Sequence, residues 1–256
     1  MGSGADAKAG DSVEATLRLA RSSRAAETAR DLTRAKWSIR SGLCDQRILA
    51  RSLACARDDG ELASERTTRR FSLVYMNAQR LFVAIDLPDQ IAESLVTLDP
   101  HYRGLIFSAP SQIHLTLAFF AAVDPTTGNL LKEKLTAISF RAFFLPVVGL
   151  GTFSRQGMPH ILWAGVGHAH PHLFQLHKRV NEAALACNLP IEERAWTPHF
   201  TIARGRGISP ALMQSFLKKH RDYDAGIMQV KEFHLYQSTL TPAGPTHRRE
   251  LTVAAR

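Results

Sequence analysis

The feature that most constrains this chain is a short motif that occurs twice. Residues 114–117 read His-Leu-Thr-Leu, and residues 199–202, 85 positions later, read His-Phe-Thr-Ile. Each copy lies in an apolar run typical of a β-strand, where successive side chains alternate between two faces. The His and Thr of each copy therefore share one face, roughly 6.5–7 Å apart, while the apolar pair faces a core. The repeat predicts two related strands that each present an imidazole and a hydroxyl.

Two such strands facing each other would form a chemically useful site. Imidazole has an unperturbed pKa of about 6.5, so it gives or takes a proton near neutrality. One imidazole can protonate a leaving oxygen while the other deprotonates the attacking water, on opposite sides of a phosphorus atom. The threonine hydroxyls can donate to the non-bridging oxygens. The motifs predict metal-independent hydrolysis of a phosphoester without a cofactor; a structural coincidence is the alternative.

Composition sets the class of protein. The chain has 256 residues, of which 45% are hydrophobic, and its formal net charge is +9. No apolar run approaches the roughly 18 residues of a membrane span, and the three cysteines form no CxxC pair or secreted disulfide framework. We expect a monomer in the cytoplasm without membrane contact. The basic charge favours an anionic partner but does not identify it.

The chain divides near Met76 into an extension, 1–75, and a domain, 76–256. The extension has 14 basic and 10 acidic residues and few large apolar side chains, which predicts disorder or loose helix. Its acidic residues argue against a targeting peptide, and its mixed charge weakens an RNA-binding tail. We favour an extension without catalytic role, or an upstream stretch that is not translated.

The domain interleaves strands and helices, which predicts an α+β fold. The predicted strands are Arg80–Asp86, Gln112–Phe120, Phe143–Leu150, His160–Val166, Thr197–Arg204, Val230–Ser238 and Arg249–Val253. The predicted helices are one that starts near Asp89, then Leu130–Phe140, Pro171–Cys187, and Ser209–His220 with Ser209 as its cap. Residues 125–128 are predicted to be a turn and Thr152–Pro159 a loop.

At the two motifs the sequence resembles the 2H phosphoesterases, and within them the RNA 2′,3′-cyclic phosphodiesterases, also called 2′-5′ RNA ligases or LigT-like proteins. The similar stretches are 79–88, 113–119, 151–163, 197–204 and 233–238. The resemblance implies a duplicated, two-lobed fold with antiparallel sheets that face across a central cleft and helices outside. The family pattern departs here at Phe200, where isoleucine is usual, and in the extension.

The resemblance also implies an activity and residue roles. It implies hydrolysis of RNA 2′,3′-cyclic phosphate ends to 2′-phosphomonoesters, with His114 as proton donor to the leaving 3′ oxygen and His199 as the base that activates water. Thr116 and Thr201 would bind the phosphate. Family members also join tRNA halves by a reversible 2′-5′ linkage, so RNA ends, tRNA halves among them, are the expected partners.

Three arginines are further candidates. Arg204 falls near the end of the second motif strand, where a guanidinium suits a cyclic phosphate or an RNA phosphate. Arg206 follows it, and Arg155 lies in the predicted loop. A solvent-exposed charge without a function is the alternative for each, and we favour a substrate-binding role only for Arg204.

Histidines and aromatic residues outside the motifs are weaker candidates. The run His168-Ala-His-Pro-His172, with His177 beyond it, has no carboxylate close in sequence, so we expect loop histidines and no metal. Aromatic residues beside strands more often belong to a core. Among Phe119, Phe120 and Trp163, we keep only Phe120 as a candidate for stacking on a base.

Two other functions stay open at this point. The domain could be a non-catalytic module that binds RNA ends, or a phosphodiesterase of a small cyclic nucleotide. The two titratable imidazoles favour an enzyme, since binding alone would not need them. No Gly-rich phosphate loop suggests ATP-dependent ligation.

Overall fold

The computed structural model describes residues 78–242 and 244–256, so the predicted extension lies outside the described residues. The strands are β1 Gln79–Asp86, β2 Leu105–Phe107, β3 His114–Val123, β4 Phe143–Val148, β5 Leu150–Arg155, β6 Met158–Gly165, β7 His199–Gly205, β8 Asp224–Val230, β9 Glu232–Thr241 and β10 Gly244–Ala254. The helices are α4 Asp89–Val96, a 3₁₀ turn η1 Pro110–Gln112, α5 Pro125–Thr136, α6 Pro171–Ala186 and α7 Pro210–Lys219. The α+β class is confirmed.

One large antiparallel sheet carries both motifs. Its strand order is β10-β9-β1-β3-β7-β6-β5, and β2 also pairs with β7. The run Leu81–Ile85 in β1 is at most 3% exposed, because β1 lies between β9 and β3 and is covered on both faces. A strand buried in this way reads as a continuous apolar run, as the sequence of β1 does.

The sheet consists of two halves joined at its centre. The first half is β10-β9-β1-β3 and the second is β7-β6-β5. The motif strands β3 and β7 pair antiparallel only at Leu115 and Phe200. The two motif strands therefore lie side by side at one point of a single sheet, and do not belong to two separate sheets.

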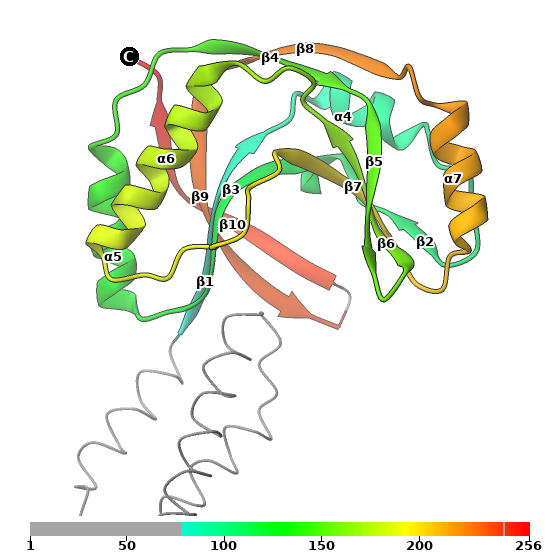
Figure 1. Cartoon of the computed structure of the whole chain (residues 1–256). Coiled ribbons are helices and arrows are strands. Elements are labelled where there is room, and N and C mark those ends of the chain that lie inside the picture. Colours follow the sequence, from blue (N-terminus) through cyan, green and yellow to red (C-terminus); the bar gives the residue numbers. More distant parts are fainter. Residues whose placement is uncertain (1–77, 243) are drawn as a thin grey trace, which may run out of the picture. The chain divides into compact units, whose positions relative to one another are not determined.

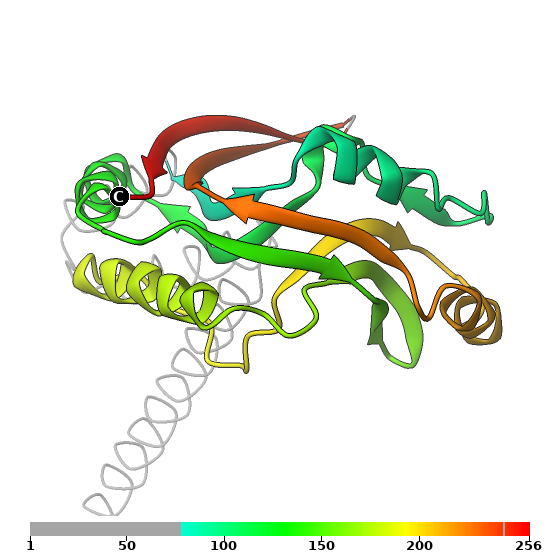
Figure 2. The ribbon, with the colours of Figure 1, turned by 90° about the horizontal axis from the view of Figure 1, so that it is seen from above.

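The helices and a second ribbon cover the sheet. Figure 1 shows α5 and α6 together at one end and α7 at the other. Strands β4 and β8 form a two-stranded antiparallel ribbon, which runs across the top of the molecule between these ends (Figures 1 and 2). Its inward residues Leu145 and Val147 are fully buried in the core. In the described ranges, no helix has the length and apolar character to cross a membrane.

Three local predictions were wrong. The predicted turn at residues 125–128 is the first turn of α5, since the Asp124 carboxylate accepts hydrogen bonds from the backbone N–H groups of Thr126 and Thr127, both at 3.0 Å. The helix therefore starts earlier than predicted and ends at Thr136. The predicted loop at 152–159 is the β5–β6 hairpin, whose turn residues Gln156 and Gly157 have positive φ values of 51° and 76°. Ser209 precedes α7 without a capping side-chain hydrogen bond.

Candidate active site

The two motifs begin their strands next to the single β3–β7 pairing. Leu115 and Phe200, which form that pair, are both fully buried. The flanking histidines and threonines are half-buried on the opposite face. Continuing the antiparallel register by one residue brings His114 beside Thr201 and Thr116 beside His199. The fold thus gathers the four predicted polar residues on one face of the sheet.

A β-bulge follows the first motif threonine. The register of β3 against β1 passes from Thr116 to Ala118 and leaves Leu117 without a partner. An extra residue of this kind reverses the alternation beyond it. Phe119 is consequently 44% exposed on the face of the motif histidine, while Phe120 is 2% exposed in the core. The interpretation of Phe120 as a stacking residue is therefore wrong, because strict alternation fails at the bulge.

The second motif has the same irregularity at the same position. The register of β7 against β6 passes from Thr201 to Ala203, so Ile202 is the extra residue. Strict alternation would turn Arg204 toward the core, whereas the bulge leaves Ala203 buried and Arg204 exposed on the side of Thr201. The bulge thus aims the guanidinium of Arg204 at the site face.

His199 is held by its own backbone. Its Nδ1 lies 2.7 Å from the carbonyl oxygen of Thr197. Since a carbonyl only accepts, Nδ1 carries the proton in the neutral ring and Nε2 keeps a free lone pair. The ring of Phe153 meets the imidazole edge-on at 4.9 Å. Burial lowers the pKa of His199, and the charge of Arg204 lowers it further.

Trp163 lies beside the second motif, on the neighbouring strand β6. It pairs with Thr201 across β6 and β7, and its ring centre lies 6.2 Å from that of His199. Gly151 on β5 lies under the indole, where any Cβ would collide with the ring. The glycine in the resembling stretch 151–163 is therefore a packing requirement of Trp163.

His114 lies in a more enclosed setting. Phe82 stacks on its imidazole at 4.8 Å, and the ring of His247 meets it edge-on at 5.7 Å. Burial is the main cause that lowers the pKa of His114 to about 4, and His247 adds to this effect. A backbone hydrogen bond to Gln112 and the charge of Asp86 act in the opposite direction.

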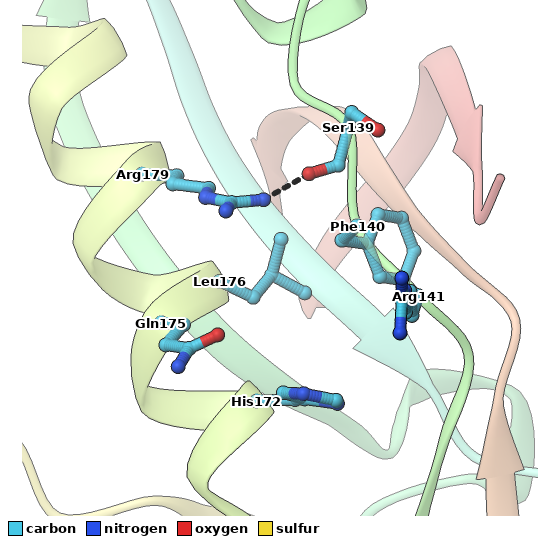
Figure 3. A pocket seen from close by; sticks show the side chains of 7 residues that line it. All are labelled: Ser139, Phe140, Arg141, His172, Gln175, Leu176 and Arg179. Atoms are coloured by element: carbon cyan, nitrogen blue, oxygen red, sulfur yellow. Dashed lines mark hydrogen bonds between the residues drawn. The ribbon is translucent and has the colours of Figure 1, made fainter.

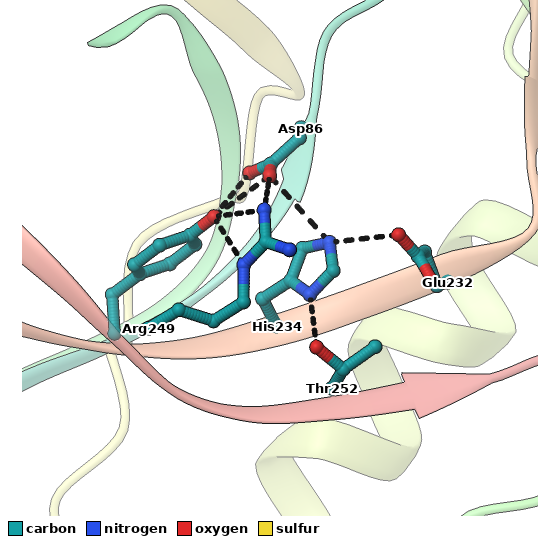
Figure 4. Close-up of polar contacts among 6 residues, drawn as sticks. Asp86, Glu232, His234, Arg249 and Thr252 are labelled. Atoms are coloured by element: carbon teal, nitrogen blue, oxygen red, sulfur yellow. Dashed lines mark hydrogen bonds and ion pairs between the residues drawn. The ribbon is translucent and has the colours of Figure 1, made fainter. Parts of the chain in front are cut away.

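A polar network fixes Asp86, which pairs with His114 across β1 and β3 (Figure 4). The Tyr236 hydroxyl donates to both carboxylate oxygens, at 2.7 and 2.9 Å, and Arg249 Nη2 donates at 2.6 Å. His234 Nε2 lies 3.5 Å away. Burial and the bond to Asp86 raise the pKa of Tyr236 to about 12, so its hydroxyl remains a donor at neutral pH.

Arg204 acts on both imidazoles. Its charge lowers the pKa of His114 and also that of His199. A guanidinium whose charge reaches both imidazoles can bind an anion on the face that carries them.

Sequence reasoning missed three groups near His114. Asp86, Phe82 and His247 come from β1 and β10, and only the tertiary pairing brings them to the motif. A signal was present for Asp86, because it ends a buried strand in one of the resembling stretches. His247 precedes the strand predicted at 249–253, so no pattern placed it.

The remaining arginine candidates lie farther along their strands. Arg155 is exposed at the end of β5, opposite Met158 in the hairpin. Arg206 is exposed after β7, and its backbone N–H donates to the carbonyl oxygen of Gly104 at 2.7 Å. Neither residue occupies a strand position that carries a motif.

The histidine run serves the start of α6. His170 precedes the helix, and its Nδ1 accepts from the backbone N–H of His172 at 3.2 Å. His177 stacks on Trp196 at 3.9 Å. Within residues 78–242 and 244–256, no three His, Cys, Asp or Glu side chains cluster as metal ligands.

A cavity of about 280 Å³ lies beside the same helix (Figure 3). Arg179 donates to the backbone oxygen of Ser139 at its edge. The lining residues are Ser139, Phe140, Arg141, His172, Gln175, Leu176 and Arg179. None of them belongs to either motif, so this cavity is separate from the four polar residues of the candidate site.

Two α+β halves that each place a His-x-Thr pair on the same face of one sheet define the class of two-histidine phosphoesterases. The chain belongs to the 2′-5′ RNA ligase superfamily, whose family model matches residues 86–241. It is 30% identical over 173 residues to the RNA 2′,3′-cyclic phosphodiesterase of Methanocaldococcus jannaschii, covering 66% of this chain and 96% of that protein. It is 31% identical over 144 residues to the protein of the same name from Aeropyrum pernix, covering 56% and 81%.

Solved structures show the same fold. One described as a phosphoesterase is 25% identical, with a TM-score of 0.58 over 70% of this chain and 98% of the other. Escherichia coli LigT complexed with 3′-AMP is 24% identical, with a TM-score of 0.59 and the same coverage. The predicted LigT-like fold is confirmed by these likenesses.

Proposed function

We propose that this protein hydrolyses the 2′,3′-cyclic phosphate at an RNA end to a 2′-phosphomonoester, with the ends of tRNA halves among its substrates. The observation that carries the proposal is the pairing of Leu115 with Phe200, which sets both His-x-Thr pairs on one face. The names of the curated relatives supply the substrate class.

The differing surroundings of the two histidines support their roles. The Asp86 carboxylate favours the charged form of His114, as a proton donor needs. His199 has its Nδ1 proton engaged by Thr197, which leaves Nε2 to accept a proton from water. Burial keeps His114 neutral in the free protein at pH 7. A bound phosphate adds negative charge beside it and raises its pKa toward the acid form.

The reaction balances within these residues. A water oxygen bonds to phosphorus and transfers a proton to His199, while the bond from phosphorus to the 3′ oxygen breaks and that oxygen takes a proton from His114. Thr116 and Thr201 donate to the non-bridging oxygens, and Arg204 neutralises their charge. When the 5′-hydroxyl of a second RNA replaces water, its oxygen bonds to phosphorus, its proton passes to His199, and the bond to the 3′ oxygen breaks to leave a 3′-hydroxyl. The product is the 2′-5′ linkage for which the superfamily is named.

The test compares a normal substrate with one whose leaving 3′ oxygen is replaced by sulfur. Both are short RNAs that end in a 2′,3′-cyclic phosphate, assayed with the full chain and EDTA present. A thiolate leaves without protonation, so the sulfur substrate should restore much of the activity lost in His114→Ala but little of that lost in His199→Ala. Equal rescue of both variants contradicts the assigned roles. No 2′-phosphate product from the unaltered protein contradicts the proposed function.

A further inference from the structure

The cavity of about 280 Å³ beside α6 lies in the helical layer, on the other side of the sheet from the two motifs. Helix α6 contacts β3, and its buried residues Leu173 and Leu176 belong to the same hydrophobic core as Leu115. The motif residues His114 and Thr116 lie on the opposite face of β3. The cavity is therefore independent of the site that the proposed function uses.

Hydrogen-bond donors line most of this cavity. Five of its lining residues carry a side-chain donor, namely Ser139, Arg141, His172, Gln175 and Arg179. Among the residues that the structure describes, no Asp or Glu lines it. Two guanidiniums without a carboxylate in the same wall give the cavity a positive potential, which favours an anion.

The two guanidiniums come from two segments that face each other (Figure 3). Arg179 extends from α6 and donates to the backbone oxygen of Ser139. Arg141 follows in the same segment as Ser139, between α5 and β4. Because a guanidinium has five N–H donors, the bond to Ser139 leaves most donors of Arg179 for a ligand. An anion between the two segments can accept hydrogen bonds from both arginines.

His172 adds an unpaired nitrogen to the same cavity. Its Nδ1 is buried and has no hydrogen-bond partner among the described residues. Buried polar side-chain atoms are usually hydrogen-bonded in folded proteins. A bound anion can pair this imidazole, since both ring nitrogens donate in its protonated form.

The exposed walls of the cavity suit a compact and hydrophilic ligand. The two apolar lining residues, Phe140 and Leu176, are only 7% and 1% exposed, so they offer no face on which a base could stack. The volume lies at the lower end of the range for ligand sites. A phosphate group is small, and its oxygens match the planar forks of two guanidiniums.

We propose that Arg141, Arg179 and His172 form a second anion site, which binds the phosphate group of a small phosphorylated molecule. Ser139 and Gln175 supply further donors at its walls. A phosphate dianion fits this set better than a carboxylate, because it brings more oxygens and more charge to the two guanidiniums. The site goes beyond the proposed function and does not depend on it.

Titration calorimetry of the full chain with inorganic phosphate tests the site, and NMR signals of the His172 imidazole report binding at the cavity. Arg141→Met and Arg179→Met should each weaken phosphate binding there by about tenfold or more, because each removes charge-assisted hydrogen bonds. Arg204→Met should leave the response of His172 unchanged. Turnover of a cyclic-phosphate RNA by Arg141→Met should match that of the unaltered protein.

Lys178→Met is the matched control. It removes one positive charge from the same helix, but Lys178 pairs with Glu182 at 3.8 Å and does not line the cavity. It should leave phosphate binding at the cavity unchanged. Arg179→Lys separates binding from folding, since it keeps the charge but loses the planar fork and should bind with intermediate affinity.

Ribose 5-phosphate distinguishes the two sources of the phosphate group. Tighter binding of ribose 5-phosphate than of inorganic phosphate supports a sugar phosphate as the ligand, and equal binding supports the free ion. Acetate that binds as tightly as phosphate contradicts the phosphate class. No response of His172 to either phosphate, or the same affinity in Arg141→Met and Arg179→Met as in the unaltered protein, overturns the site.

Discussion

The two halves of the site have the same main-chain geometry at their motifs and differ in the side chains that surround the two histidines. In both, a histidine begins the strand, a threonine follows two residues later, and a bulge occupies the next position. Both histidines also engage the backbone two residues upstream, at Gln112 and Thr197. The copies are thus equivalent in main-chain geometry.

Their environments separate the two imidazoles. His114 lies under Phe82 and beside His247, with the carboxylate of Asp86 across the strand pair. The pKa of His199 is lowered by burial and by the charge of Arg204, and it is raised by the hydrogen bond to the backbone of Thr197. The two motifs therefore have equivalent main chains, while the neighbouring strands give the two imidazoles different electrostatic surroundings.

The largest expected effect comes from removing either imidazole. His114→Ala and His199→Ala should each lower kcat by about 10²- to 10⁴-fold, because each removes one proton transfer. Initial rates with a cyclic-phosphate RNA measure this, and circular dichroism checks the fold. His101→Ala removes an exposed histidine and should retain full activity. Full activity in either motif variant would contradict the expectation that each half supplies one proton transfer.

Removal of the Arg204 guanidinium should affect both halves of the site at once. Arg204→Met is expected to raise KM by about tenfold or more through a lost charge-assisted contact with the phosphate. It should also raise the pKa of both His114 and His199, because the charge of Arg204 lowers both. NMR titration of the imidazole signals measures the shifts. Phe119→Met is the matched control at the equivalent position and should leave both pKa values in place; a shift of only one histidine in Arg204→Met would contradict a shared anion site.

The pH profile tests the asymmetry. Both imidazole pKa values lie below 6.5 in the free protein, so the optimum of kcat/KM should lie below pH 6.5 and the rate should fall as pH rises above it. Asp86→Asn removes a charge that raises the pKa of His114. It should therefore lower kcat/KM by about several-fold on the alkaline side, because a smaller fraction of His114 is protonated there. The acid side should stay nearly unchanged.

Glu232→Gln is the control for that change. It removes a carboxylate that lies 3.5 Å from His234 in the same network but has no effect on the pKa of His114. Its pH profile should match that of the unaltered protein. Identical profiles for Asp86→Asn and the unaltered protein would show that the carboxylate does not distinguish the two halves.

The smallest effect on activity is expected at the centre of the sheet. Phe200 is fully buried opposite Leu115. Phe200→Ile should destabilise the fold by about 1–2 kcal/mol through a small cavity and leave kcat within about twofold, as its side chain points away from the site. Urea unfolding measures the loss of stability, and initial rates measure kcat. A large loss of activity in a folded variant would show that this pair also sets the position of the histidines.

Local sequence patterns were sufficient for much of the fold. The continuous apolar run of β1 and the proline-started helix α6 follow directly from period and end signals. The start of α5 was missed, although Asp124 and Pro125 form a regular helix start. The β5–β6 hairpin was missed because its polar tip resembles a loop in sequence.

The sequence by itself determined which polar side chains of the two motifs share a strand face. Alternation over four residues places His114 with Thr116 and His199 with Thr201 on one face, and the apolar partners specify which face is buried. These relations hold in any strand and need no knowledge of what pairs with it. The prediction of a two-histidine site rests on them, while the prediction of the α+β class rests on the interleaved strands and helices.

The tertiary structure decided which other side chains reach those four residues. A bulge forms only when a partner strand has one residue fewer, so the exposure of Phe119, the burial of Phe120 and the direction of Arg204 depend on β1 and β6. Asp86 reaches His114 by strand pairing, and Tyr236 and Arg249 reach Asp86 from the far end of the chain. Contacts between residues distant in sequence leave no local period, which is why the differences between the two halves could not be predicted from the motifs.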